Sequence, residues 1–401
     1  MGIISCLGNT LTRVTESLRV GRSGIVLLPE RKQMGFNSCL SGAIQDFQPN
    51  NYLTRKQRKT LPEFGIWAWA AIEQALAQSG TEPETLREDE MTGIIFGNDS
   101  SAETPVEQVE ILKNAGDTRS IGSGHIFRSL SSTITLNIST MLGLRGMSWT
   151  IASACASGAM AIGQGAELIA CGRQNRIICG GAQEISWQSM CSFDALGAFS
   201  NREESPEKAS RPFDRNRDGL VPSGGAACVV LESRTGAKMR GAKILGEILG
   251  YGVGTDGYHI VSPSGEGIER TMRMAIMNSG LNHGDIDLVL AHATSTPAGD
   301  EKEAEALCRI FTDNGSSPLI FAPKGLTGHE FWMAGASQVV YGLLMAHHGF
   351  VAGNTNLLNP EGAAERLNLP REATEQETQI LLCNASGFGG TNASLLVRAG
   401  G

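Results

Sequence analysis

The chain has 401 residues, a net charge of −8, 41% hydrophobic and 18% charged residues, which is ordinary for a globular protein and long enough for two domains. The acidic balance makes nucleic acid an unlikely partner. No apolar run reaches the length of a membrane span and no basic, apolar leader opens the chain, so we expect no membrane segment, no secretory signal and a cytoplasmic protein. The nine cysteines are scattered without a Cys-x-x-Cys pair, which argues against a disulfide framework or a zinc site.

Short apolar runs alternate with helical segments along the whole chain, and no linker or low-complexity tract divides it. This alternation predicts an α/β fold. The expected strands are residues 92–96, 147–151, 176–179, 226–231, 288–291, 319–322 and 379–383. The expected helices are residues 64–79, 268–279, 300–311 and 335–348.

Cys155 lies between the strand-like run 147–151 and a stretch without charge, 156–166. Because this stretch is small or apolar on every side, it predicts a buried helix. A thiol at the N-terminus of such a helix lies near the positive end of the helix dipole and near unpaired N–H groups, and both favour the thiolate. Cys155 is therefore a candidate nucleophile, although a cysteine that only packs would give the same local pattern.

Two histidines and a glycine-rich loop follow strands later in the chain. His292 comes directly after the apolar run 286–290, and His329 comes after the run 319–322. The C-terminal ends of strands are where α/β folds place their chemistry. After the run 379–383 comes Gly-Phe-Gly-Gly at 387–390, and the backbone N–H groups of such a loop can approach a ligand closely.

These motifs together resemble the β-ketoacyl-[acyl carrier protein] synthases, and in particular the type I and II elongation enzymes. The resemblance runs along nearly the whole chain. It includes Met-Gly-Ile-Ile-Ser at 1–5, Gly-Arg-Ser-Gly-Ile at 21–25, the stretch 206–214, Arg-Asp-Gly at 217–219 and Pro-Ser-Gly-Glu-Gly at 263–267. The family usually has a strand before Met1, so we expect the first strand to be shortened or the sequence to begin inside it.

The resemblance implies the thiolase fold, in which two similar α/β halves pack as a five-layer sandwich. We place the boundary near Met239. The N-terminal half, 1–238, then carries Cys155, and the C-terminal half, 239–401, carries both histidines and the glycine-rich loop. The active site is expected between the two halves.

The resemblance also implies a decarboxylating Claisen condensation, in which malonyl-[acyl carrier protein] extends an acyl thioester by two carbons during fatty acid elongation. Cys155 would hold the acyl group as a thioester. His292 and His329 would donate hydrogen bonds to the thioester oxygen of the malonyl unit. Both must then be neutral, with tautomers that their hydrogen-bond partners fix.

Further residues of the site follow from the same resemblance. The backbone N–H groups of Cys155 and Phe388 would form an oxyanion hole. Lys324, five residues before His329, and Glu303 would orient the histidine pair electrostatically. Glu303 has an alternative interpretation as an acid near a helix N-terminus, where the dipole favours it.

The implied substrates are carried on the phosphopantetheine arm of acyl carrier protein, and the reaction needs no metal and no bound cofactor. Thr294 and Thr296 would hydrogen-bond the arm, and Gly389 and Gly390 are further substrate-binding candidates.

Although the chain is acidic overall, it contains one basic cluster, which suggests how the carrier protein docks. It contains Arg55, Lys56 and Lys59, and family members use basic residues at these positions to bind acidic carrier protein. A solvated helix start would give the same cluster. The resemblance further implies a homodimer, or a heterodimer with a partner ketosynthase, with the segment 131–140 near the interface.

The sequence departs from the family pattern at the second histidine and at the glycine-rich loop. The family usually has Gly-His-x-x-Gly-Ala-Ala-Gly, whereas this chain has Gly-His-Glu-Phe-Trp-Met-Ala-Gly at 328–335. The family also usually has Phe where this chain has Ser386. We expect Trp332, Ser386 and Phe193 to shape the acyl pocket, and Trp332 to fill space that the missing Phe leaves.

Three alternative functions remain from the residues. A specialised ketosynthase of an aryl polyene, resorcinol or other polyketide pathway would use the same chemistry, and Trp332 and Ser386 are compatible with it. A non-catalytic chain-length partner subunit is disfavoured, because such partners lack the cysteine that stands here at Cys155. A degradative thiolase would use coenzyme A thioesters and a second active-site cysteine, for which no motif is present.

Overall fold

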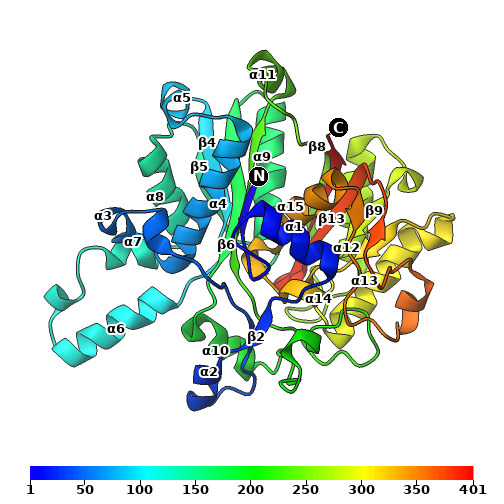
Figure 1. Cartoon of the computed structure of the whole chain (residues 1–401), viewed down its shortest axis with the longest axis horizontal. Helices are drawn as coiled ribbons and strands as arrows, with labels where there is room; N and C mark the ends of the chain where they lie inside the picture. Colours follow the sequence, from blue (N-terminus) through cyan, green and yellow to red (C-terminus); the bar gives the residue numbers. More distant parts are fainter. Residues whose placement is uncertain (401) are drawn as a thin grey trace.

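Each half of the chain builds one mixed five-stranded sheet (Figure 1). The structure, a computed structural model, describes residues 1–400. The N-terminal sheet has the order β1-β7-β6-β4-β5, with β1 (Gly2–Ile4), β4 (Thr92–Gly97), β5 (Ser148–Ile151), β6 (Arg176–Gln183) and β7 (Gly225–Glu232). The C-terminal sheet has the order β10-β9-β13-β14-β8, with β8 (Gly246–Thr255), β9 (Leu288–Leu290), β10 (Leu319–Phe321), β13 (Ile380–Gly387) and β14 (Thr391–Ala399).

The two sheets repeat one topology. Counted in chain order within each half, the strands lie in the order first, fifth, fourth, second, third in both sheets. In the N-terminal sheet β5, β4 and β6 are parallel, while β7 and β1 add antiparallel. In the C-terminal sheet β10, β9 and β13 are parallel, while β14 and β8 add antiparallel. The backbone therefore contains the internal duplication that the sequence indicated only through its family resemblance.

Helices cover both outer faces and fill the space between the sheets. α9 (Ser157–Ala170) and α15 (Ala334–His347) pack against each other between the sheets. α4 (Glu63–Ser79) and α8 (Thr133–Leu142) cover the outer face of the N-terminal sheet, and α12 (Glu266–Ser279) and α13 (Pro297–Ile310) cover that of the C-terminal sheet (Figure 1). The expected thiolase-like five-layer sandwich is confirmed.

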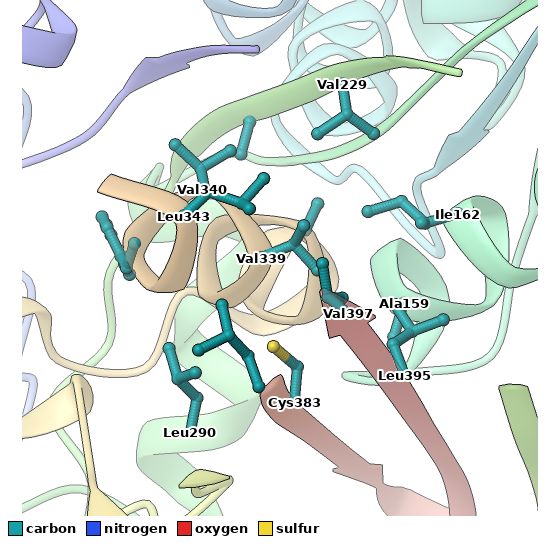
Figure 2. Close-up of a cluster of buried hydrophobic side chains, with 14 of the residues drawn as sticks. Ala159, Ile162, Val229, Leu290, Val339, Val340, Leu343, Cys383, Leu395 and Val397 are labelled. Atoms are coloured by element: carbon teal, nitrogen blue, oxygen red, sulfur yellow. The ribbon is translucent and has the colours of Figure 1, made fainter. Parts of the chain in front are cut away.

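α15 and the first half of α9 are apolar all round because they have neighbours on every side. Figure 2 shows Val339 and Leu343 of α15 among side chains from α9, β9 and β14. Nearly all of α15 is buried, and α9 carries no charge before Glu167, as expected. The helices approach so closely that a Cβ at Gly335 would lie 2.5 Å from the Cβ of Ala159.

The expected strands and helices are all present, with shifted ends. The strand expected at 379–383 continues to Gly387, and the helix expected from residue 300 begins at Pro297, since proline suits the first helical position. Met239, near which we propose that the halves divide, ends α11 between the two sheets. The remaining elements are α1 (Leu11–Val20), β2 (Ile25–Leu27), α2 (Pro29–Gln33), β3 (Leu40–Gly42), α3 (Arg55–Arg58), α5 (Pro83–Glu88), α6 (Glu103–Ala115), α7 (His125–Ser129), α10 (Trp187–Ala195), α11 (Arg234–Met239), α14 (Lys324–Thr327), β11 (Phe350–Val351) and β12 (Thr374–Glu375).

Candidate active site

Cys155 lies on a tight turn between β5 and the N-terminus of α9. The preceding residue, Ala154, has φ = 46°, a left-handed conformation that residues with a Cβ rarely adopt and that marks functional turns. The Ala154 N–H donates to Asp99 Oδ2 at 2.6 Å, and the hydroxyl of Ser157 donates to the Ala154 carbonyl at 2.6 Å. These two hydrogen bonds hold the turn that presents the thiol.

The structure brings both predicted histidines to this thiol. His329 Nε2 lies 3.0 Å from Cys155 Sγ. The rings of His292 and His329 are 5.3 Å apart between centroids and almost perpendicular, at 89°. His292 follows β9 as expected, whereas His329 follows the short helix α14 and not β10 directly. Three segments far apart in the sequence therefore meet at one point between the halves.

Burial decides the protonation of these three groups. It raises the pKa of the Cys155 thiol to about 12, more than nearby Lys324 lowers it. Burial outweighs the contribution of the helix N-terminus, which stays a prediction, and the thiol lies close enough to His329 to pass its proton to that ring. Burial, followed by the charge of Lys324, lowers the pKa of His292 and His329 well below 6.5. Both imidazoles are neutral at neutral pH.

In the part of the chain that the structure describes, the Nδ1 atoms of the two histidines face no protein hydrogen-bond partner. Nδ1 of His292 and Nδ1 of His329 are buried, and within residues 1–400 neither has a hydrogen-bond partner. His329 has a partner at its other nitrogen, Cys155 Sγ at 3.0 Å, and the expectation that hydrogen-bond partners fix the tautomers stays a prediction.

Glu303 holds the backbone that carries His292. Its carboxylate accepts the His292 N–H at 2.8 Å, the Ala293 N–H at 2.7 Å and the side-chain amide of Asn384 at 3.2 Å. The acid in the first turn of α13 is Asp300 and not Glu303, so the alternative interpretation of Glu303 as a helix-start acid does not describe its contacts.

Lys324 is the first residue of α14, and its side chain is 2% exposed. Its ammonium group is buried and makes no hydrogen bond within the described chain. Burial lowers the pKa of Lys324 to about 8, although the charges of Glu303 and Glu330 act to raise it. The charge of Lys324 lowers the pKa of both histidines, and its role in orienting them stays a prediction.

The glycine-rich loop packs directly on the nucleophile turn. A Cβ at Gly387 would lie 2.9 Å from the backbone N of Cys155, so only glycine allows this approach. Gly389 and Gly390 have φ values of 71° and 72°. The Gly389 N–H donates to the Ile260 carbonyl and is therefore turned away from the thiol, while the oxyanion role of the Phe388 and Cys155 N–H groups stays a prediction.

A cavity of about 440 Å³ leads to the thiol and histidines. The expected substrate-binding residues Thr294, Thr296 and Gly390 line it, as do Phe388, Ser386 and Phe193. Thr294 and Thr296 hold each other through their hydroxyls at 3.0 Å.

Trp332 does not line this cavity. It is 5% exposed, and its indole N–H donates to the Ser100 carbonyl at 3.2 Å. Phe331 lines the cavity instead, with its ring 4.6 Å from that of His329 and 4.7 Å from that of Phe193. Any effect of Trp332 on the pocket therefore acts through Phe331 and Phe193.

The sequence analysis missed several residues that build the site. Phe331 occupies a variable position of the family pattern, and nothing in the sequence marks it. Asp99 lies after β4 and reaches the nucleophile turn only in the fold. Asp300 accepts the Thr294 N–H and the Phe213 N–H, both at 2.9 Å, and its place six residues after Thr294 within one motif could have indicated it.

The expected docking residues lie away from the cavity. Arg55, Lys56 and Lys59 are exposed on and just after α3, which Figure 1 shows on the opposite side of the molecule from α12 and α13. None of them lines the cavity. In residues 1–400, no helix has the length and apolar character needed to cross a bilayer, and no group of three or more His, Cys, Asp or Glu side chains is arranged to hold a metal ion.

Comparisons with known proteins agree along the whole chain. The Beta-ketoacyl synthase N-terminal domain matches residues 1–237, and the Beta-ketoacyl synthase C-terminal domain matches residues 245–358. The 3-oxoacyl-[acyl-carrier-protein] synthase 1 of Escherichia coli (strain K12) is 38% identical over 99% of this chain and 97% of its own length. The synthase 2 of Vibrio cholerae is 34% identical with the same coverage.

Solved structures give the same picture. A beta-ketoacyl synthase from Burkholderia phymatum superimposes with a TM-score of 0.93 at 31% identity and covers 99% of this chain and 97% of its own. The ishigamide ketosynthase/chain length factor gives a TM-score of 0.91 at 28% identity and covers 100% of this chain and 98% of its own. With Cys155 and the two histidines assembled in this fold, the chain belongs to the beta-ketoacyl synthase family, and it is an acyltransferase of the condensing type.

Proposed function

We propose that the chain is a 3-oxoacyl-[acyl carrier protein] synthase that condenses an acyl thioester with malonyl-[acyl carrier protein]. The observation that carries this proposal is the contact of Cys155 Sγ with His329 Nε2 at 3.0 Å, with His292 beside it at the end of one cavity. The full-length relatives that are 38% identical are synthases of this activity.

The first half-reaction moves the acyl group to the enzyme. Cys155 Sγ gives its proton to His329 Nε2 and attacks the carbonyl carbon of the acyl thioester. The backbone N–H groups of Cys155 and Phe388 stabilise the oxyanion, and one such donor is worth about 3 kcal/mol. When the C–S bond to the carrier breaks, the carrier sulfur takes the proton back, and the acyl group remains on Cys155.

The second half-reaction forms the carbon–carbon bond. The malonyl carboxylate leaves as CO₂, and its electron pair forms an enolate whose oxygen receives hydrogen bonds from His292 and His329. The enolate carbon attacks the acyl carbonyl on Cys155 and expels the sulfur, which takes up one proton. The products are a 3-oxoacyl thioester on the carrier, CO₂ and the free thiol. Neutral imidazoles suit this step, because a charged pair would be costly in this buried site.

The carrier and its arm are assigned to two separate surfaces. Thr294 and Thr296, together with Gly390, hold the phosphopantetheine arm in the cavity, and their positions on its lining support this. The exposed cluster Arg55, Lys56 and Lys59 docks the acidic carrier protein by charge complementarity. Nine free cysteines support a reducing compartment such as the cytoplasm.

A dimer through the edge of the N-terminal sheet fits the exposed apolar surface. β5 is one of the two edge strands of this sheet, and its Trp149 is 42% exposed, although isolated edge strands usually avoid such side chains. Leu136 of α8 and Phe127 of α7 are also exposed. α8 begins within the expected segment 131–140, and much of it is buried in its own subunit. A monomer by light scattering at micromolar concentration that is still fully active would overturn the dimer.

A specialised polyketide ketosynthase is a second candidate. The likeness to the ishigamide ketosynthase/chain length factor and the aromatic residues around Cys155 favour it. Product analysis by mass spectrometry decides between the two, with purified protein, malonyl-carrier protein and acyl carriers of several lengths and with aryl and polyenoyl groups. Extension of saturated chains supports fatty acid elongation, extension of only aryl or polyenoyl groups supports the second candidate, and no 3-oxoacyl product with any of them overturns both.

A further inference from the structure

Glu330 is a buried carboxyl group that the mechanism above does not use. It directly follows His329 and is 2% exposed. Its Oε1 accepts the Tyr341 hydroxyl at 2.7 Å, and its Oε2 accepts the Ser337 hydroxyl at 2.5 Å. Both donors lie one turn apart on α15. Because the two oxygens are held by separate donors, the carboxylate cannot rotate, and the backbone at His329 is tied to the central helix.

Lys324, at the start of the same segment, needs such a group nearby. A buried ammonium without a partner is very costly, and the Lys324 ammonium makes no hydrogen bond within residues 1–400. The groups whose charges act on it are Glu303 and Asp300 of α13, Glu330, and the Cys155 thiol when ionised. Glu303 already accepts three hydrogen bonds from the His292 side of the site. Glu330 is the one acid of this set that lies on Lys324's own segment.

We propose that Glu330 is a positioning residue of the condensation: its carboxylate, held by Ser337 and Tyr341, fixes the segment that carries His329 and keeps Lys324 charged inside the protein. A charged Lys324 in turn stabilises the negative charge that develops on the malonyl oxygen when CO₂ leaves. This inference rests on the proposed function and adds to it an acid at a position where the family pattern specifies no residue.

The pKa values of the surrounding groups leave a pH range, just above 8, in which only Lys324 changes its charge. Burial raises the pKa of Glu330 to about 7, and burial lowers that of Lys324 to about 8. The thiol of Cys155 has a pKa of about 12, and the pKa of Tyr341 lies well above 10. Cys6, whose thiol also feels Glu330, has a pKa raised by burial. Among the groups that face Lys324 and Glu330, Lys324 alone loses its proton just above pH 8.

The test is the pH dependence of malonyl-carrier protein decarboxylation for Glu330→Gln. Without the negative charge the pKa of Lys324 falls, so the alkaline limb of kcat should move to lower pH by about one unit, with KM unchanged. Glu330→Asp keeps the charge, and its limb should stay near that of the wild type. Glu184→Gln is the matched control, because Glu184 is also a buried acid whose pKa burial raises to about 7, and it holds Ala102 and no residue of this site.

The outcomes distinguish a failure of the proposed function from a failure of the role of Glu330. A wild-type protein without decarboxylation overturns the proposed function. An active wild type with the same alkaline limb in Glu330→Gln overturns only the role of Glu330, as does an equal shift in Glu184→Gln. If Glu330→Gln does not fold, Tyr341→Phe with Ser337→Ala provides the test. Loss of both donors frees the segment that carries His329 from α15, so kcat for decarboxylation should fall with KM unchanged, and an unchanged kcat overturns the inference.

Discussion

The two turns that lead into the central helices occupy equivalent places in the duplicated fold, but one is uncharged and the other carries buried charged side chains. The turn 152–156, between β5 and α9, is short and uncharged, and it presents one sulfur on a strained backbone. The segment 322–333, between β10 and α15, is long and carries Lys324, His329 and Glu330. A duplicated fold thus supplies two helix N-termini, of which one follows the Cys155 thiol and the other follows a segment with buried charge and His329.

The largest expected effect comes from removing the single reactive group of the short turn. Cys155→Ala should abolish acyl transfer and condensation, while decarboxylation of malonyl-carrier protein continues because both histidines remain. Intact-protein mass spectrometry and CO₂ release measure the two steps separately. Cys171→Ala, which removes an exposed thiol at the other end of α9, is the control and should leave both steps unchanged. An acyl group found by peptide mapping on a different cysteine would refute the assignment.

Substitutions of His329, in the long segment, and of the neighbouring His292 should impair decarboxylation more than acyl transfer. His329→Ala and His292→Ala should each lower decarboxylation by about 10²–10⁴-fold, since they remove a donor to the malonyl oxygen, while Cys155 can still be acylated. His329→Ala should slow acylation more than His292→Ala, because only His329 touches the thiol. Exposed His348→Ala should behave as wild type. Near-normal condensation in both active-site variants would contradict the proposed roles.

Much of the fold could be predicted from local pattern, because alternating apolar runs and charge-free stretches reflect burial within one element. The positions of Cys155 after β5 and of His292 after β9 could be predicted for the same reason, whereas the short helix α14 before His329 could not. Hydrogen bonds between distant turns could not be predicted, and the bond from the Ala154 N–H to the Asp99 carboxylate is an example. Neither could the direction of the Trp332 ring, since a rotamer depends on neighbours that only the fold supplies.

Trp332 tests whether the long segment also shapes the pocket. The sequence predicts that it compensates for Ser386, whereas the structure packs it against Phe193, Phe331 and the Ser100 carbonyl. Trp332→Gly should destabilise the protein by about 3–5 kcal/mol, as large-to-small core changes do, and should shift the preferred acyl length. A double-mutant cycle with Ser386→Phe gives the coupling in urea unfolding and in product length. Coupling of about 0.5–3 kcal/mol supports compensation, and additivity in both means that the two residues act independently.

The smallest effect is expected at the surface, outside both turns. Arg55→Glu with Lys59→Glu should raise the KM for carrier-linked substrates several-fold at low salt and weaken its salt dependence, because exposed charges act mainly on the rate of encounter. Arg55 and Lys59 form no ion pair with another described residue, so their reversal should leave the fold intact.

Pantetheine thioesters without a carrier protein separate docking from chemistry in this double variant. They reach the cavity without touching α3, so their turnover should be unchanged. Arg398→Glu, which reverses a charge on the C-terminal sheet that pairs with Glu247, is the matched control and should leave the KM for the carrier substrate as it is. An equal loss with free pantetheine thioesters would mean that the substitutions disturb the active site, and an unchanged KM with carrier substrates would mean that the carrier docks elsewhere. In the expected case both turns keep their full activity while delivery of the substrate alone is impaired.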